Sequence, residues 1–188
     1  EDPNLGTWAY EYDGTDNQLS VIDARGSLKV CSYYDLAGRV KSRRYVAPGV
    51  TPTPCLPPAG TPTTTAIGTP GPVYSYDSGT NAKGKRTGAD FDVSQKLWTY
   101  DPTGRVASEN HTVNGTGGGS YTTVYSYKAN DFISRIDLPS VTGDDSKLDH
   151  SYAPSGAVSR IVAKDGTILI DQTTYDASGG IDVRNYGP

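Results

Sequence analysis

The residue types that most often carry chemistry are few in this sequence and lie far apart. Its two histidines, His111 and His150, belong to no metal-ligand or catalytic-triad spacing, so we expect both on the surface. The segment 79–85 has the first spacing of a phosphate-binding loop, but Arg86 stands where a Ser or Thr must ligate Mg²⁺. No helix pattern follows to aim N–H groups at a phosphate, and we interpret the segment as a loop insertion.

Carboxylates and nucleophiles give no clearer site. Asp144 and Asp145 could hold Ca²⁺, but the alternating oxygen ligands and the closing Glu of a dedicated calcium loop are missing, so we expect a solvated turn. No Gly-x-Ser-x-Gly nucleophile elbow is present. The set of nucleophile, base and orienting group that catalysis needs is not visible. The sequence therefore predicts a protein that is not an enzyme and that binds no cofactor or metal.

Cysteine usage and candidate glycosylation sites indicate an extracellular setting. Cys31 and Cys55 are the only cysteines, and the sequence has no Met. Few oxidisable residues suit an oxidising compartment, and the even count predicts one disulfide, with two buried thiols as the alternative. Asn110 and Asn114 begin N-glycosylation acceptor sequences. We expect a secreted or cell-surface protein. Because the sequence starts at Glu1 without a leader, we interpret it as a processed chain or an excerpt of a longer one.

The composition predicts many short strands. The chain holds 14 Tyr against 2 Phe, together with 22 Gly and 13 Pro, which is a turn-rich and helix-poor inventory. Its net charge of −4 is small and its basic residues are scattered, so nucleic acid and anionic lipid are not expected partners. No apolar run approaches the roughly 18 residues of a membrane span.

A repeat organises the whole sequence. The cleanest copies read Tyr-Asp-Leu-Ala-Gly-Arg-Val at 34–40 and Tyr-Asp-Pro-Thr-Gly-Arg-Val at 100–106. Successive aligned tyrosines are 22, 42, 24, 27, 25 and 23 residues apart. These repeat tyrosines are Tyr12, Tyr34, Tyr76, Tyr100, Tyr127, Tyr152 and Tyr175. The longest interval contains the Pro/Thr-rich stretch 47–73, which we interpret as an inserted surface loop because proline donates no ladder hydrogen bond.

Each copy predicts a strand, a turn and a returning strand. The Asp after the repeat tyrosine caps backbone N–H groups, and the Gly three residues later accepts the left-handed conformation. The turn residues assigned in this way are Asp35, Gly38, Asp101, Gly104, Asp176 and Gly179. A second turn half a period later, as at Asp165-Gly166, reverses the chain again. The fold class is therefore all-β: a single domain, 1–188, built as an antiparallel meander of hairpin repeats with a dozen or more strands.

The repeat tyrosines recur at equivalent strand positions. We expect them to form an aromatic ladder between neighbouring repeats, with rings packed and hydroxyls hydrogen-bonded or hydrated. A platform of exposed rings for binding sugars is the alternative.

The pattern Tyr-Asp-x-x-Gly-Arg-Val resembles the YD repeat of the Rhs family, which includes teneurins, bacterial toxin-complex proteins and wall-associated proteins. The resemblance runs from Tyr10 to about Tyr186 and is weaker at Lys128 and Ala153, where the Asp is replaced. It implies about seven YD repeats in a twisted β-strip or partial shell, since in that family the strip can spiral around a cargo polypeptide. Larger members add an aspartyl self-cleaving segment that Asp101-Pro102 superficially resembles, but that pair falls in repeat register and we assign it to a turn.

The two ends of the array suggest a function. The copies at Tyr12 and Tyr175 look like interior copies rather than polar caps, and an unpaired strand edge recruits other chains. Seven copies are also few for closing a shell. The sequence thus favours a structural protein whose copies join head to tail, through their terminal repeats, into an extracellular fibre or surface layer. A segment of an Rhs-type toxin-encapsulating shell is the alternative. An adhesin that binds glycans or a receptor through exposed tyrosines and Trp98 is a second alternative.

Overall fold

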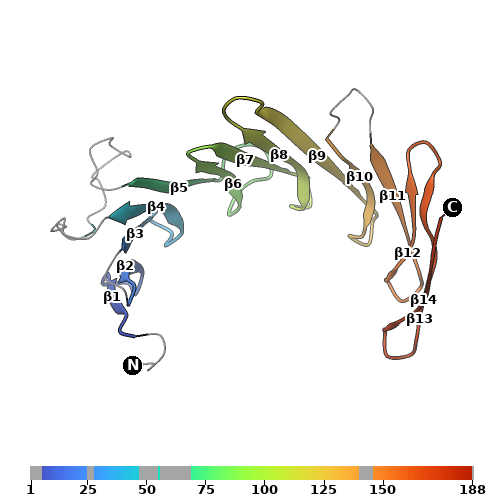
Figure 1. Ribbon diagram of the computed structural model, residues 1–188, viewed down its shortest axis with the longest axis horizontal. Coiled ribbons are helices and arrows are strands. Elements are labelled where there is room, and N and C mark those ends of the chain that lie inside the picture. Colours follow the sequence, from blue (N-terminus) through green and yellow to red (C-terminus); the bar gives the residue numbers. More distant parts are fainter. Residues whose placement is uncertain (1–5, 25–27, 47–54, 56–68, 140–145, 188) are drawn as a thin grey trace. The chain divides into compact units, whose positions relative to one another are not determined.

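The computed structural model of this chain describes residues 6–24, 28–46, 55, 69–139 and 146–187. These residues form strands and turns only (Figure 1). The strands are β1 (Ala9–Tyr12), β2 (Gln18–Ile22), β3 (Lys29–Tyr34), β4 (Val40–Val46), β5 (Thr69–Tyr76), β6 (Arg86–Phe91), β7 (Ser94–Tyr100), β8 (Val106–Val113), β9 (Gly119–Tyr127), β10 (Ile133–Asp137), β11 (Lys147–Tyr152), β12 (Val158–Ala163), β13 (Ile168–Tyr175) and β14 (Ile181–Tyr186). The predicted all-β fold of hairpin repeats is confirmed. The described part of the chain contains no helix long and apolar enough to span a membrane.

The chain divides into two compact units, which are described separately. Unit 1 comprises Glu1–Ser78 with Lys83–Gln95, and unit 2 comprises Gly79–Ala82 with Lys96–Pro188. In unit 1 each of β1 to β5 pairs antiparallel with the strand that follows it. In unit 2 the same holds for each of β8 to β13. Each unit is therefore an open antiparallel meander, and the single domain over 1–188 stays a prediction.

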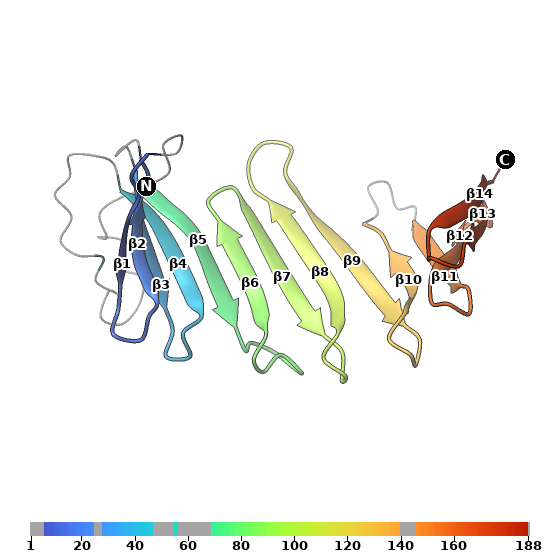
Figure 2. The ribbon, with the colours of Figure 1, turned by 90° about the horizontal axis from the view of Figure 1, so that it is seen from below.

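Every repeat tyrosine stands at the end of a strand, immediately before a hairpin turn. Tyr34 lies opposite Val40 and Tyr127 lies opposite Ile133, with the same six-residue offset in both hairpins. Because a meander places alternate turns at the same edge, the turns that follow the repeat tyrosines line one edge of unit 1, after β1, β3 and β5 (Figure 2). In unit 2 they line one edge after β7, β9, β11 and β13. We call these edges the turn edge of each unit.

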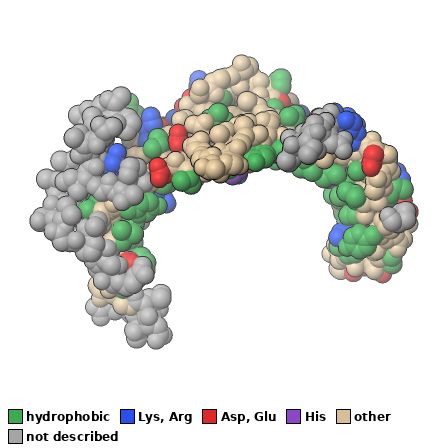
Figure 3. All heavy atoms as spheres, turned by 45° about the horizontal axis from the view of Figure 1, so that its top comes forward, with side chains coloured by type: hydrophobic (Ala, Val, Ile, Leu, Met, Phe, Trp, Pro, Cys, Tyr) green, Lys and Arg blue, Asp and Glu red, His purple; other side chains and the backbone are tan. Residues whose placement is uncertain are grey.

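The buried core is small because the strands form a single layer. Among the described residues, the buried apolar side chains are Cys31, Val46, Cys55, Ala82 and Ala89. Side chains alternate in exposure along the strands, as in β9, where Tyr125 and Tyr127 are half-buried and Val124 and Ser126 are exposed. Hydrophobic side chains also lie at the surface of the C-terminal strands, at the right of Figure 3. Strand pairing and contacts within the layer must therefore carry the stability that a two-layer core usually supplies.

The predicted disulfide is present. Cys31 in β3 is bonded to Cys55, with their Cα atoms 5.6 Å apart and a sequence separation of 24. The two cysteines pack with Val46 and the partly buried Tyr33, so the bond ties one point of the insertion to the sheet of unit 1.

The Pro/Thr-rich insertion ends earlier than predicted. Residues 69–73 belong to β5, whereas 47–54 and 56–68 lie outside the described residues. Pro70 stands opposite Arg44, and the register shifts between Ser42 and Arg44. Such a bulge is a place where a strand accommodates proline. At Gly71 an added Cβ would lie 2.8 Å from the carbonyl oxygen of Arg43, so only glycine allows this close approach of β4.

Candidate functional site

Each of the short Tyr-Asp turns is built by one carboxylate and one left-handed residue, whereas the third, at Asp77, is a longer loop in which the Asp77 N–H donates to the Lys85 carbonyl. In the second turn the Asp35 N–H donates to the Arg39 carbonyl at 2.9 Å, and the Gly38 N–H donates to the Asp35 carbonyl at 3.0 Å. Oδ1 of Asp35 accepts the N–H groups of Ala37 and Arg39 at 2.9 and 3.0 Å. Gly38 has a φ of 73°, in the region that favours glycine. The local chemistry of two residues therefore explains why the chain reverses here.

The same arrangement recurs along the chain. Asp101 and Asp176 accept the equivalent backbone N–H groups, and Gly104 and Gly179 have φ values of 84° and 87°. In the first turn Asp16 takes the glycine position with a φ of 63°. Asp tolerates this conformation better than most residues do, because its short polar side chain can form local hydrogen bonds.

The two divergent copies keep the turn without its carboxylate. The N–H of Lys128 donates to the Phe132 carbonyl at 2.7 Å, and that of Ala153 donates to the Ala157 carbonyl at 2.9 Å. Left-handed residues again stand three positions after the replaced Asp, with φ of 66° at Asp131 and 86° at Gly156. The repeat is weak in sequence at these two copies, but their backbone hydrogen bonds and left-handed residues match those of the other short turns.

An arginine joins each clean copy to the next repeat. Nε of Arg39 donates to Oδ2 of Asp35 at 2.8 Å within its own turn. Its terminal nitrogens donate to both carboxylate oxygens of Asp77, in the next repeat, at 3.1 and 2.6 Å. The guanidinium carbon also lies 4.3 Å from the ring centroid of Tyr76. Arg39 therefore pairs with two carboxylates and one aromatic face, which a single planar guanidinium suits.

Arg105 repeats this link in unit 2. Its Nε donates to Oδ2 of Asp101 at 2.7 Å, and one terminal nitrogen donates to Oδ1 of Asp131 at 2.6 Å. Its guanidinium carbon lies 4.4 Å from the ring centroid of Tyr127. No role was predicted for either arginine, although both recur at the same position of the two clean copies, and that recurrence was the available signal.

The hydroxyl of a repeat tyrosine reaches back to the preceding repeat. Tyr34 donates to the carbonyl of Gln18 at 2.9 Å, the first residue of the strand that returns from the first turn. The corresponding bonds, of 2.7 to 2.8 Å, are Tyr76 to Val40, Tyr127 to Val106, Tyr152 to Ile133 and Tyr175 to Val158. Each bond satisfies a carbonyl beside the turn and holds two repeats in register.

This arrangement differs from the expected tyrosine ladder. Equivalent tyrosines stand two strands apart, a separation of roughly 9.6 Å, which exceeds the 4.5–7 Å spacing of paired rings. An arginine covers the tyrosine ring in two copies, Arg39 on Tyr76 and Arg105 on Tyr127. In another copy the ring of Phe132 stacks on that of Tyr152 at a centroid distance of 4.7 Å.

Hydrogen bonds lower the pKa of several carboxylates at the turn edge. Burial raises the pKa of Asp101, but hydrogen bonds from the Arg105 N–H, the Thr103 hydroxyl and the Arg105 guanidinium outweigh it and lower that pKa to about 2. The pKa of Asp35 is lowered in the same way, against burial, by Arg39 and Ala37. For Asp77 the hydrogen bond from Arg39 is the main cause of a lowered pKa.

The remaining predicted residues lie apart from the turn edge. The half-buried Trp98 donates its indole N–H to Glu109 at 3.1 Å. The Asn110 side-chain amide donates to Ser120 and Thr122 across the β8–β9 pair, whereas Asn114 is exposed in the following turn. Their glycosylation stays a prediction.

The histidines, the segment 79–85 and the pair Asp144 and Asp145 were the other candidates for chemistry. Nδ1 of His150 lies 3.1 Å from the Leu148 carbonyl, and His111 stands in β8 opposite Tyr121. The segment 79–85 belongs to the loop between β5 and β6, as expected. Asp144 and Asp145 lie outside the described residues. Within the described residues, no group of three or more His, Cys, Asp or Glu side chains could hold a metal ion.

Comparison by sequence identifies no relative, since no family model and no curated protein match the chain. Solved structures do match. The chain is similar to part of TcdB2-TccC3 in its structure with Cdc42, with a TM-score of 0.75 and 15% identity over 99% of this chain and 9% of that chain. TcdB2-TccC3 alone gives a TM-score of 0.72 at 15% identity, over 97% and 9% of the two chains.

A Tc holotoxin pore of Photorhabdus luminescens gives the same picture, with a TM-score of 0.73 and 15% identity over 100% of this chain and 9% of that chain. The chain thus spans 9% of the length of the toxin-complex chains that it resembles. Such a likeness shows the fold, and that fold is the YD-repeat β-meander that the Tyr-Asp-x-x-Gly-Arg-Val copies predict.

Proposed function

We propose that this chain is a non-enzymatic segment of an Rhs-type shell that encloses a toxin polypeptide. The observation that carries the proposal is the match of 97–100% of the chain to a stretch of Tc toxin chains, at TM-scores of 0.72–0.75. A wall segment needs no active site, because its task is to continue a sheet and to exclude solvent and proteases from what it encloses.

The contacts of the turn edge support this role. In both units, tyrosine hydroxyls and arginines join one repeat to the next, as with Tyr76 and Arg39 in unit 1 and Tyr127 and Arg105 in unit 2. A single-layer sheet has little buried core, so such links between successive hairpins are what keep a thin wall in one register.

The terminal strands support a continuing array. Every residue of β1 and every residue of β14 is exposed. Tyr12 is 57% exposed and Tyr186 is 71% exposed. Unpaired edges of this kind are expected to pair with further strands.

A head-to-tail fibre is the second candidate, because the exposure of β1 and β14 also suits pairing between copies of this chain. An adhesin gains less support, since the faces of Tyr76 and Tyr127 are covered by guanidinium groups and Trp98 is bound to Glu109.

Expression of the complete reading frame that contains this chain tests the proposal. We expect further YD repeats in the frame, hollow particles in electron micrographs, and a polypeptide that resists protease until denaturant unfolds the sheet. Particles that contain no protease-resistant polypeptide would contradict the proposal of an enclosing shell. Fibres that lengthen with the concentration of the purified 188-residue chain would favour the second candidate instead.

A further inference from the structure

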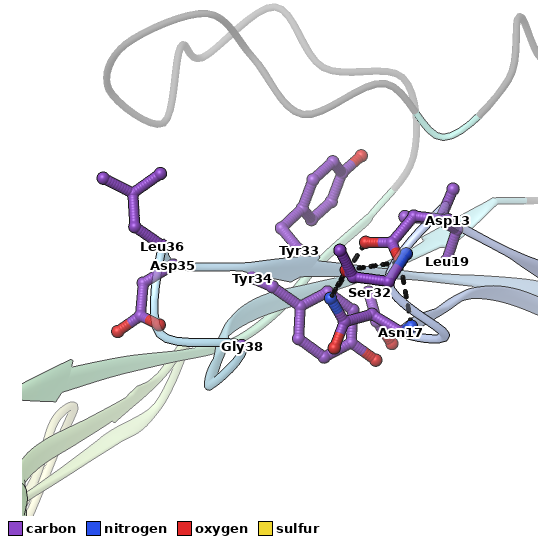
Figure 4. A pocket seen from close by; sticks show the side chains of 10 residues that line it. Asp13, Asn17, Leu19, Ser32, Tyr33, Tyr34, Asp35, Leu36 and Gly38 are labelled. Carbon is purple, nitrogen blue, oxygen red and sulfur yellow. Dashed lines mark hydrogen bonds between the residues drawn. The ribbon is translucent and has the colours of Figure 1, made fainter.

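An open cavity of about 430 Å³ lies between the first two Tyr-Asp turns of unit 1 (Figure 4). Its lining from the first turn includes Asp13, Thr15 and Asn17, and its lining from the second includes Tyr34, Asp35 and Gly38. Both polar and aromatic groups therefore surround the space.

The position of this cavity corresponds to that of an arginine elsewhere on the turn edge. The fourth residue after the turn Asp is Arg39 in the second copy, Arg105 in the fourth and Asn17 in the first. Arg39 extends from its own turn toward the next one, where it meets Asp77 and the face of Tyr76. Among the residues that the structure describes, no such side chain fills the equivalent space between the first and second turns.

Asn17 reproduces only the near half of the arginine contacts. Its side-chain amide donates to Oδ2 of Asp13 at 2.9 Å, as Nε of Arg39 does to Asp35. The shorter side chain ends there. The Tyr34 hydroxyl meanwhile donates to Gln18, so its ring is anchored as Tyr76 is anchored to Val40. The contact between the first and second repeats thus retains the carboxylate of Asp13 and the ring of Tyr34 but lacks a guanidinium group.

The charges of the first turn are also unbalanced. Asp13 accepts its four hydrogen bonds from the neutral groups of Thr15 and Asn17. Asp35 and Asp101, by contrast, each pair with an arginine. A hydrogen bond from the Asn17 side chain is the main cause that lowers the pKa of Asp13 to about 2, so its carboxylate is ionised at neutral pH.

The other turns without arginine do not present the same vacancy. In the fifth copy Phe132 takes the arginine position and stacks on Tyr152. In the sixth copy Ala153 replaces the turn Asp and Ala157 replaces the arginine, so carboxylate and guanidinium are lost together. The last copy also keeps its carboxylate, Asp176, with Gly180 at the arginine position, but no further copy follows it in this sequence to supply a ring. The first copy keeps the carboxylate, lacks the arginine and faces the ring of the next repeat tyrosine, Tyr34.

We propose that the cavity between the first two turns is a binding slot for the guanidinium group of an arginine presented by another polypeptide segment. The guest lies over the ring of Tyr34 and against the carboxylate of Asp13, as Arg39 lies over the ring of Tyr76 and against the carboxylate of Asp35. This assignment rests on the comparison between repeats and is independent of the shell proposal.

Titration of the ¹⁵N-labelled 188-residue chain with a capped Gly-Arg-Gly peptide tests the slot. We expect saturable shifts of the Asn17 and Gly38 amide signals, with a dissociation constant of about 1–10 mM for one exposed charge pair and one cation–π contact. The same peptide with citrulline, which has the shape of arginine without its charge, should give no saturable shift. Absence of saturation with the arginine peptide, or equal binding of the citrulline or lysine peptide, overturns the proposal.

Two variants separate the slot from a general charge effect. Asn17→Arg should fill the cavity, abolish peptide binding and raise the melting temperature by about 2–4 °C. Asp13→Asn should weaken binding at least about ten-fold, whereas the matched Asp176→Asn, in the last turn, should leave it unchanged. Unchanged binding in both Asn17→Arg and Asp13→Asn, or an equal loss in Asp176→Asn, overturns the assignment.

Discussion

The guanidinium carbon of Arg105 lies 4.4 Å from the ring centroid of Tyr127, and the hydroxyl of that tyrosine donates to the carbonyl of Val106, the residue after the arginine. The arginine thus reaches toward the next repeat, and the tyrosine hydroxyl reaches toward the preceding one. The pair closes a contact between two hairpins that are joined in sequence only through β8 and β9. Stability of this sheet should therefore depend on positions at the turn edge more than on apolar residues.

Replacing Arg105 tests the forward contact. We expect Arg105→Lys to lower the melting temperature of the chain, because a lysine cannot pair with Asp101 and Asp131 while it also covers the Tyr127 ring. Arg135→Lys is the matched control, since Arg135 makes one exposed pair with Asp149 on the next strand. Thermal unfolding followed by circular dichroism measures both. Equal losses in the two variants would show that Arg105 makes an ordinary surface pair.

Removing one tyrosine hydroxyl tests the backward contact. Tyr127→Phe keeps the ring under Arg105 and leaves the Val106 carbonyl without its donor, so the free energy of unfolding should fall by about 0.5–1.5 kcal/mol. Tyr12→Phe, at the exposed first copy, should change it by less than about 0.5 kcal/mol. Urea titrations measure the difference, and an equal effect at both positions would contradict a role for this hydroxyl.

The local parts of the turn edge could be predicted from the sequence, because the residues that build a turn are neighbours. Asp35 and Gly38 act within one seven-residue copy, and their types alone indicate the capped, left-handed turn that the structure shows. The fold class followed from the regular return of that copy.

The links between repeats could not be predicted in this way, because they depend on strand register. Arg39 and its partner Asp77 are 38 residues apart, across the insertion, and they meet only when four strands pair correctly. The expected tyrosine ladder overlooked that a two-strand repeat separates equivalent rings by two strand spacings. Pro70 was assigned to a loop because sequence reasoning does not see the bulge in β4 and β5 that accommodates it.

The left-handed turn residues provide a backbone test. Gly104→Ala should cost about 1–2 kcal/mol of unfolding free energy, because Gly104 has a φ of 84° and a Cβ disfavours this region. Gly14→Ala in the first turn is the control, since an added Cβ at Gly14 would meet no atom within 4 Å and its φ is not left-handed. A loss at Gly14 as large as that at Gly104 would contradict the assigned turn geometry.

The disulfide provides a test of the insertion. Cys31→Ser with Cys55→Ser should lower the free energy of unfolding by about 3.5 kcal/mol, the chain-entropy value for a loop of this length. A reducing agent should produce a loss of the same size in the native chain and none in the double variant. If reduction leaves the unfolding curve of the native chain unchanged, the bond contributes nothing to the stability of unit 1.

Acid provides the last test, because the turn carboxylates act as charged acceptors. Asp101 has a pKa of about 2 in the folded chain against an ordinary value of 3.8, so the unfolded chain binds its proton first as the pH falls. A group whose pKa is lowered by folding stabilises the folded state above its unfolded pKa, and that contribution disappears as the pH falls through its folded pKa. The melting temperature should therefore decline between about pH 5 and pH 2, and Asp101→Asn should start lower at pH 7 and decline less. Melting curves recorded across this range decide the matter, because a variant that follows the native slope would mean that Asp101 contributes nothing to the acid sensitivity of the sheet.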